Sequence, residues 1–265
     1  MKFSYMLAPL EDYSDGALRT LCYKYGADLT FTEMTMINPL SQGNKSTWSR
    51  LDFKDKTPVV IQLLGGNEMR LKKFLKMFKA HKGFKGFNLN IGCPSPHVIN
   101  VGLGCAMIKR IGKTKRLIKI INDHGYKCSI KMRLGMNKSE KEKKVYLNLI
   151  DGTNPNFFIV HAREGSQTYE EEPDYSVYDE CVKTGKNIIA NGSINNKKQV
   201  SEFKKLGLKG VMIGRAAIIN PTIFNQLKGH KSPTLKQIEK EYLELANKFE
   251  SPNRYRKNFF KHFGK

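Results

Sequence analysis

The sequence lacks any run of about 18 apolar residues, the length that a membrane-spanning helix requires. Its N-terminus, "MKFSYMLAPLEDYSD", reaches an acidic residue too early for a secretory signal peptide. No basic amphipathic segment of the kind that lies on membranes stands out. We therefore expect a cytoplasmic protein without membrane contact.

Paired cysteine motifs are also missing. The five cysteines show neither CxxC nor any other metal-ligand spacing, and their odd number argues against a disulfide framework. We therefore predict no metal site. A functional cysteine has to be recognised from its own surroundings.

Acidic residues are scarce. The chain has 24 Asp and Glu against 46 Lys and Arg, which gives a formal net charge of +22. Such an excess favours a polyanionic partner such as nucleic acid, because positive surfaces attract polyanions over long distances. A general lysine bias in the proteome is the alternative. The sequence indicates no protein partner.

Short apolar runs alternate with amphipathic helical patterns along the chain. The runs predict eight strands, at 5–9, 29–34, 58–64, 87–92, 129–134, 157–162, 187–191 and 210–214. This alternation implies parallel strands joined by right-handed crossovers, and eight such units suit an α/β fold of the (β/α)8 TIM barrel type. A doubly wound open sheet is the competing fold, but its GxGxxG fingerprint is missing after the first strand.

The strand pattern stops after about residue 222. The segment 235–265 has the pattern of an amphipathic helix followed by a short basic segment. We therefore predict a catalytic barrel over residues 1–225 and a short, helical, basic C-terminal appendage over residues 226–265.

Polar residues gather where the predicted strands end, which is where TIM barrels build their active sites. Taken alone, each of them is better explained as a hydrogen-bonded core residue or a loop cap; their common position at the strand ends is what indicates a functional site. These residues are Glu11, Glu33, Gln62, Asn90, Cys93, Lys131, Arg133, His161, Arg163, Asn191, Gly192, Gly214 and Arg215.

The last two strand ends, in "NGSI" and "IGRAAIINP", suit a phosphate. Barrels often bind phosphate with the loops after strands seven and eight, where glycines allow close backbone approach and Arg215 offers a bidentate cation. Lys131 indicates an anion inside the barrel, with a Schiff-base role as the alternative. Gln62 suits the polar edge of a heterocycle, and a core amide is its alternative role.

Cys93 lies in "NIGCPSP", directly after the fourth predicted strand. Pro94 and Pro96 restrict the backbone there and fix the direction of the thiol. This position suits an acid or a nucleophile. The other four cysteines have no such surroundings and are expected to be small buried hydrophobic residues.

Taken together, "MLAPLEDYSD", "FTEM", "VVIQLLGG", "LNIGCPSP", "SIKMRLG", "HAREGSQTY", "IANGSI" and "VMIGRAAIINP" resemble the motif series of tRNA-dihydrouridine synthases, in order and spacing across nearly the whole barrel. The resemblance implies FMN-dependent reduction of a specific uridine in tRNA, with NADPH as reductant. It implies hydride transfer to carbon 6 of uracil and protonation of carbon 5 by Cys93. The target nucleotide would have to be extruded into the barrel mouth.

The resemblance also implies roles for the strand-end residues. Contacts to the flavin ring fall to Pro9, Leu10, Glu11, Gln62, Lys131 and His161. Contacts to the FMN phosphate fall to Asn191, Gly192, Ser193, Gly214 and Arg215. Contacts to the substrate fall to Asn90, Arg133 and Arg163. Members of the family usually carry a longer C-terminal helical domain than the one or two helices expected here, so the resemblance leaves the tRNA grip undefined.

Two other functions remain possible from the sequence. A dihydroorotate-dehydrogenase-like FMN oxidoreductase would share the barrel and the cysteine, but a small pyrimidine needs no polycationic surface. A non-catalytic RNA-binding barrel would explain the charge, but it would not need Cys93, Lys131 and Arg215 together. Bound flavin would separate the enzymes from the binding protein, and tRNA-dependent flavin oxidation would separate the two enzymes.

Overall fold

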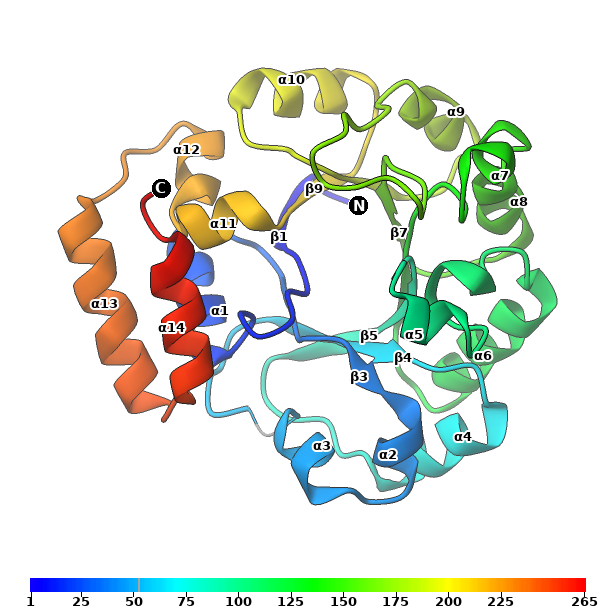
Figure 1. Cartoon of the computed structure of the whole chain (residues 1–265), viewed down its shortest axis with the longest axis horizontal. Helices are drawn as coiled ribbons and strands as arrows, with labels where there is room; N and C mark the ends of the chain where they lie inside the picture. Colours follow the sequence, from blue (N-terminus) through cyan, green and yellow to red (C-terminus); the bar gives the residue numbers. More distant parts are fainter. Residues whose placement is uncertain (52) are drawn as a thin grey trace.

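The structure is a computed structural model that describes residues 1–51 and 53–265, and it shows parallel strands enclosed by a ring of helices (Figure 1). The strands are β1 (Ser4–Leu7), β2 (Thr30–Phe31), β3 (Thr35–Met36), β4 (Val59–Leu64), β5 (Phe84–Ile91), β6 (Cys128–Met132), β7 (Phe158–His161), β8 (Ile188–Asn191) and β9 (Gly210–Ile213). Their order in the sheet is β1-β9-β8-β7-β6-β5-β4-β2, and β3 also pairs with β4. A parallel bridge between Met6 and Leu29 joins the two ends of this sheet. The predicted TIM barrel is confirmed.

The second predicted strand, 29–34, differs from the prediction. Of this range, Thr30–Phe31 forms β2, and β3 follows beyond its predicted end; both strands pair with β4. At the interruption the side-chain oxygen of Thr32 accepts the backbone N–H of Gln62 at 3.0 Å, so a side chain replaces a backbone carbonyl in the ladder. The backbone N–H of Thr32 still donates to the Val60 carbonyl at 3.0 Å, so the interruption begins after Thr32 and contains Glu33.

The helices cover the outside of the barrel. They are α1 (Gly16–Lys24), α2 (Ile37–Ser41), α3 (Lys45–Ser49), α4 (Glu68–Met77), α5 (Pro96–Ile99), the 3-10 helix η1 (Gly104–Met107), α6 (Ile111–Asp123), α7 (Lys138–Glu142), α8 (Val145–Gly152), α9 (Val177–Lys183), α10 (Lys197–Lys205), α11 (Arg215–Ile219), α12 (Ile223–Lys228), α13 (Leu235–Lys248) and α14 (Asn253–His262). Lys144, whose left-handed backbone has φ 52°, separates α7 from α8.

The apolar core has two layers. A large cluster fills the space between strands and helices, and a smaller one fills the barrel interior with Met6, Ala8, Phe31, Val60, Ile159, Ile189 and Met212. Because side chains alternate along a strand, the residues two positions after Val60, Ile159 and Ile189 also point inward. These residues are Gln62, His161 and Asn191, so the interior changes from apolar to polar toward the strand ends.

The C-terminal segment forms a hairpin of α13 and α14 on one side of the barrel (Figure 1). The short basic segment predicted after the first of these helices is itself a helix. Its apolar side is buried: the ring of Phe259 stacks on Tyr242 of α13 with centroids 3.6 Å apart. Both residues belong to the same core cluster as the barrel.

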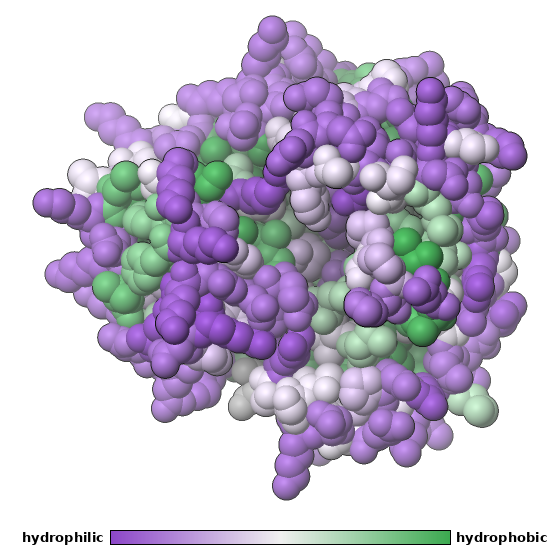
Figure 2. Space-filling view, in the orientation of Figure 1, coloured by the Kyte–Doolittle hydropathy of each residue, from purple (hydrophilic) through white to green (hydrophobic). Residues whose placement is uncertain are grey.

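Figure 2 shows the face that carries α5, α11 and α14 hollowed near its centre, with hydrophilic side chains along much of the rim. Among the helices described, none combines the length and apolar composition needed to cross a bilayer.

Candidate active site

Hydrogen-bonded polar side chains connect three neighbouring strands, β4, β5 and β6. Gln62 Nε2 donates to Asn88 Oδ1 at 2.8 Å, and Asn88 Nδ2 donates to Ser129 Oγ at 2.9 Å. Asn90 Nδ2 donates to Gln62 Oε1 at 2.9 Å. Asn88 and Ser129 were missed from the sequence, although Asn88 lies two residues before Asn90 and so shares its face of the strand.

Asn90 connects this network to Cys93. Its Oδ1 accepts the backbone N–H groups of Gly92 at 3.1 Å and Cys93 at 2.9 Å, while its Nδ2 also contacts the sulfur of Met34 at 3.3 Å. The donors and the acceptor of this amide are all occupied, so it holds the loop that carries the thiol. Contact of Asn90 with the substrate remains a prediction. It would require Asn90 to give up one of these hydrogen bonds for one to the substrate.

Cys93 differs from the other cysteines in its exposure. Its side chain is half-buried in the loop between β5 and α5, whereas the other four are buried. Burial raises the pKa of Cys105 to about 12, although the two cysteines are neighbours, with the N–H of Cys105 bonded to the carbonyl of Cys93 at 3.0 Å. The geometry therefore distinguishes one accessible thiol, as predicted from the prolines around it.

Two arginines converge on Ser193 at the ends of β7, β8 and β9. Arg163 Nη2 and Arg215 Nη2 donate to Ser193 Oγ at 2.9 Å and 3.1 Å, and both donate to the Tyr169 carbonyl at 3.2 Å. Ser193 has a left-handed backbone (φ 46°). Arg163 was predicted to contact substrate, but its guanidinium is fully buried beside Arg215. Its position therefore suits the predicted phosphate site.

Gly192 has to be a glycine in this arrangement. Its φ of 121° is rare for other residues, and an added Cβ would lie 2.9 Å from His161 Cδ2. Gly214 is less restricted: a Cβ there would meet the Leu10 side chain at 3.5 Å. This second contact places the loop after β1 beside the loop after β9, so the predicted flavin-ring and phosphate residues adjoin.

His161 is held in its neutral form. Arg163 Nη1 donates to His161 Nε2 at 3.1 Å, so that nitrogen is an acceptor and the ring proton lies on Nδ1. Burial lowers the pKa of His161 well below its usual value, and the cationic side chains of Lys131 and Arg133 nearby lower it further.

Lys131 lies inside the barrel opposite Asn90 on the neighbouring strand. Burial lowers the pKa of its ammonium to about 8, and the charge of Arg133 adds to that effect. Within residues 1–51 and 53–265, no hydrogen bond or ion pair reaches Lys131 Nζ. A cation inside the barrel without a partner indicates a place for an anion or a polar ligand edge.

Arg133 was predicted to contact the substrate, but in the structure it contacts the loop after β7. Its Nη1 donates to the carbonyls of Glu164 at 2.8 Å and Gln167 at 3.0 Å, and the guanidinium lies 5.6 Å from the Tyr169 ring centroid. It therefore orders the loop after β7. A direct contact with substrate remains a prediction.

We call Lys131, Arg133, Arg163 and Arg215 the cation cluster. In the described part of the chain, none of them forms an ion pair with a carboxylate. Four cations around one end of the barrel without carboxylates fit an anionic ligand, and phosphate suits the paired guanidinium groups best. The donor set therefore fits a phosphorylated flavin.

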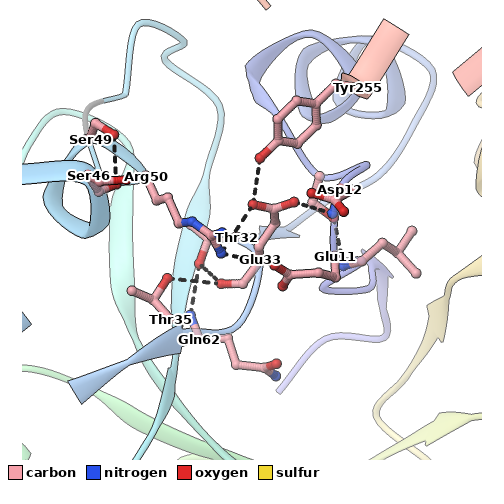
Figure 3. Close-up of polar contacts among 12 residues, drawn as sticks. Glu11, Asp12, Thr32, Glu33, Thr35, Ser46, Ser49, Arg50, Gln62 and Tyr255 are labelled. Atoms are coloured by element: carbon pink, nitrogen blue, oxygen red, sulfur yellow. Dashed lines mark hydrogen bonds and ion pairs between the residues drawn. The ribbon is translucent and has the colours of Figure 1, made fainter. Parts of the chain in front are cut away.

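A second group of side chains at the barrel mouth contains three carboxylates (Figure 3). Oxygens of Glu11, Asp12 and Glu33 lie within 4.8 Å of one another. Arg50 Nη1 contacts Glu11 Oε1 at 3.0 Å and Glu33 Oε2 at 3.8 Å, and Tyr255 of α14 donates to Glu33 Oε2 at 2.7 Å. Arg50 therefore offsets part of the negative charge of this group.

Comparison with known proteins identifies the family. The sequence pattern of the dihydrouridine synthase (Dus) family matches residues 6–264. The chain belongs to the dihydrouridine synthase family. A dihydrouridine synthase is a flavin-dependent oxidoreductase, which agrees with the cation cluster and with the single accessible thiol.

Three curated relatives of this dihydrouridine synthase have informative names. A probable tRNA-dihydrouridine synthase of Helicobacter pylori is 30% identical over 244 residues, which are 89% of this chain and 73% of the relative. The probable tRNA-dihydrouridine synthase 2 of Bacillus subtilis is 27% identical, with 92% and 78% covered. A tRNA-dihydrouridine(47) synthase [NAD(P)(+)]-like protein of Xenopus laevis is 26% identical, with 88% and 37% covered.

Solved structures share the fold of this dihydrouridine synthase. A morphinone reductase mutant in complex with tetrahydroNAD has a TM-score of 0.59 and 10% identity, with 89% of this chain and 90% of that chain covered. A tryptophan synthase complex from Pyrococcus furiosus has a TM-score of 0.53 and 16% identity, with 86% and 100% covered. At these identities the likeness concerns the barrel alone.

Proposed function

We propose that this dihydrouridine synthase reduces a uridine of tRNA to 5,6-dihydrouridine, with FMN as cofactor and NADPH as reductant. Family membership supports the reaction, and the names of the relatives support tRNA as substrate. The observation that carries the mechanism is one accessible thiol, Cys93, on the same barrel mouth as the cation cluster. A cytoplasmic location is part of the proposal, since it rests on the tRNA substrate.

The chain offers groups that suit each part of FMN. Arg163, Arg215 and Ser193 would hold the phosphate, with Asn191, Gly192 and Gly214 shaping the cradle. Lys131 and Gln62 would contact the polar edge of the ring, and His161 would help to hold it. Pro9, Leu10 and Glu11, in the loop after β1, would border the ring.

When bound, a reduced flavin supplies a hydride for carbon 6 of the uracil. Cys93 would then donate its proton to carbon 5, which acts as the basic atom once carbon 6 has accepted the hydride. Asn90 fixes the backbone that carries the thiol, because its side-chain oxygen accepts the N–H groups of Gly92 and Cys93. The target nucleotide has to leave its stack to reach the thiol.

The proposal is tested on the purified protein. We expect visible absorption typical of a flavin, reduction of that flavin by NADPH, and reoxidation by tRNA taken from cells that lack this protein. Dihydrouridine should then be found at one tRNA position of the product. A colourless protein, or a reduced flavin that tRNA does not oxidise, would contradict the proposal.

FMN binding should take up a proton above about pH 8. Burial lowers the pKa of Lys131 to about 8, and acceptor atoms at the polar edge of the flavin ring favour the ammonium, which donates a hydrogen bond to them. Above that pH free Lys131 is mostly neutral, so binding recharges it and the affinity falls as the pH rises; below that pH the lysine is already charged. Calorimetry in two buffers of different ionisation enthalpy measures this uptake, and uptake that persists in Lys131→Met would refute the assignment.

We further propose that residues 226–265 contact tRNA while residues 1–225 hold the flavin. Arg254, Lys257 and Lys261 are exposed along one side of α14, whereas Tyr255 and Phe259 are buried on the other side. Deleting the helix would uncover Tyr242, which stacks on Phe259. Point changes on the exposed side are therefore a sharper test than truncation.

The double variant Lys257→Gln and Lys261→Gln should bind tRNA more weakly and keep its full flavin content. The slope of log affinity against log salt should become shallower by about 0.7 to 0.9 for each tRNA phosphate that the variant no longer neutralises. Lys72→Gln and Lys76→Gln, two exposed lysines of α4 with four-residue spacing, are the matched control. Equal slopes for both double variants would show that the tRNA contact of α14 is not specific.

A further inference from the structure

Glu33 joins three parts of the chain at the interruption of the second strand (Figure 3). One carboxylate oxygen accepts the backbone N–H of Asp12, in the loop between β1 and α1. The other accepts the hydroxyl of Tyr255 in α14 at 2.7 Å and lies 3.8 Å from Arg50 Nη1, directly after α3. We call Glu33 with Asp12, Arg50 and Tyr255 the Glu33 junction.

Both Glu33 and Tyr255 are buried, with 5% and 7% of their surfaces exposed. Burial raises the pKa of the Glu33 carboxyl above its usual range, and the hydrogen bond from Tyr255 opposes that increase. The carboxylate therefore depends on the donors around it. Loss of one donor would leave a buried carboxylate oxygen unsatisfied, which costs free energy and disturbs the remaining contacts of Glu33.

The Glu33 junction connects the region proposed to bind the flavin with the region proposed to bind tRNA. The Asp12 side belongs to the loop of Leu10 and Glu11, which is proposed to border the flavin. The Tyr255 side belongs to α14, whose exposed cations are proposed to contact tRNA. Two further contacts join these parts: Arg254 Nε lies 3.1 Å from Asp12 Oδ1, and Asn258 Nδ2 donates to the Asp12 carbonyl at 3.3 Å.

We propose that Glu33 is a positioning residue of the reaction, which fixes α14 to the loop after β1 and so sets the register between bound tRNA and the flavin. This inference rests on the proposed function. Glu33 touches neither reacting atom. It acts through Tyr255 and Asp12, and its effect is therefore expected in the tRNA step rather than in flavin binding.

The chain contains a matched control for this contact. Tyr25, directly after α1, donates its hydroxyl to Glu241 Oε2 of α13 at 2.7 Å. This bond also joins the barrel to the C-terminal hairpin through a tyrosine and a glutamate, at the same length. Tyr25→Phe and Tyr255→Phe therefore remove the same chemical group from the same pair of structural units, but only the second change affects the Glu33 junction.

The test compares Tyr255→Phe with Tyr25→Phe in the flavin-loaded protein. Tyr255→Phe should keep flavin affinity, the rate of flavin reduction by NADPH and tRNA affinity within about threefold of the wild type. Its single-turnover reoxidation by saturating tRNA should be about tenfold slower or more, because a misplacement of about 1 Å can cost about 10²-fold in rate. Tyr25→Phe should match the wild type in every measurement.

Glu33→Gln provides a second variant. Flavin reoxidation by tRNA in the double variant Glu33→Gln and Tyr255→Phe should be no slower than in the slower single variant, because both changes act on one contact. Equal reoxidation rates for Tyr255→Phe and Tyr25→Phe, or additive effects in the double variant, would overturn the positioning role. A wild-type protein whose flavin is not oxidised by tRNA would instead overturn the proposed function, and the inference with it.

Discussion

Cys93→Ala should lower dihydrouridine formation by about two to four orders of magnitude, the usual cost of a lost general acid. The variant should still bind FMN and oxidise NADPH, because the cation cluster and the amide network do not use the thiol. Asn90 accepts the backbone N–H of residue 93, which alanine retains, so the loop keeps its conformation. The loss should therefore lie in the proton transfer and not in the structure of the site.

Single-turnover kinetics with pre-reduced enzyme and excess tRNA measures this loss directly. Cys105→Ala is the control, because its thiol is buried and its pKa is raised to about 12, so it is unsuited to proton transfer. We expect that variant to turn over tRNA at nearly the wild-type rate. Wild-type turnover by Cys93→Ala would exclude the thiol as the proton donor.

The second large effect is expected for Arg215→Ala, which should weaken FMN binding by roughly 10- to 100-fold. A charge-assisted hydrogen bond contributes about 1.5–3 kcal/mol, and about 1.4 kcal/mol corresponds to tenfold in affinity. Arg163 and Ser193 would remain, so some flavin should still bind. Flavin content after purification and titration of the flavin-free protein with FMN and with riboflavin both measure the change.

Comparison with riboflavin separates a phosphate contact from a general loss of structure. Arg215→Ala should bind riboflavin as well as the wild type does, since riboflavin has no phosphate. Arg116→Ala, an exposed arginine of α6 paired with Glu68, is the control and should bind FMN normally. If Arg215→Ala purifies with a full complement of FMN, the phosphate lies elsewhere.

The sequence predicted the barrel because its signals are local. Short apolar runs, their alternation with helices and the residues at strand ends all lie within a few positions of one another. The same local signals made Cys93 a candidate through its neighbouring prolines, and Arg215 a candidate through the glycine before it. Each of these residues is placed by its own strand, so the order of strands was enough to bring them to one end of the barrel.

The sequence did not predict the contacts that depend on distant elements. The position of Arg163 beside Ser193 depends on how the loop after β7 folds back, with Arg163 Nε donating to the Glu171 carbonyl at 2.7 Å. The break at Lys144 requires a left-handed backbone that no glycine signals. The Glu33 junction joins residues that are far apart in the sequence, so no local pattern predicts their contact.

The hydrogen bond between Glu33 and Tyr255 spans 222 positions of the chain. At synthesis rates of about 5–20 residues per second, α14 leaves the ribosome roughly 11 to 44 seconds after Glu33. Until α14 has been made, Glu33 lacks one of its donors and the loop after β1 lacks its outer support. The catalytic mouth therefore reaches its final form late in synthesis, long after Cys93 and the first half of the barrel have been made.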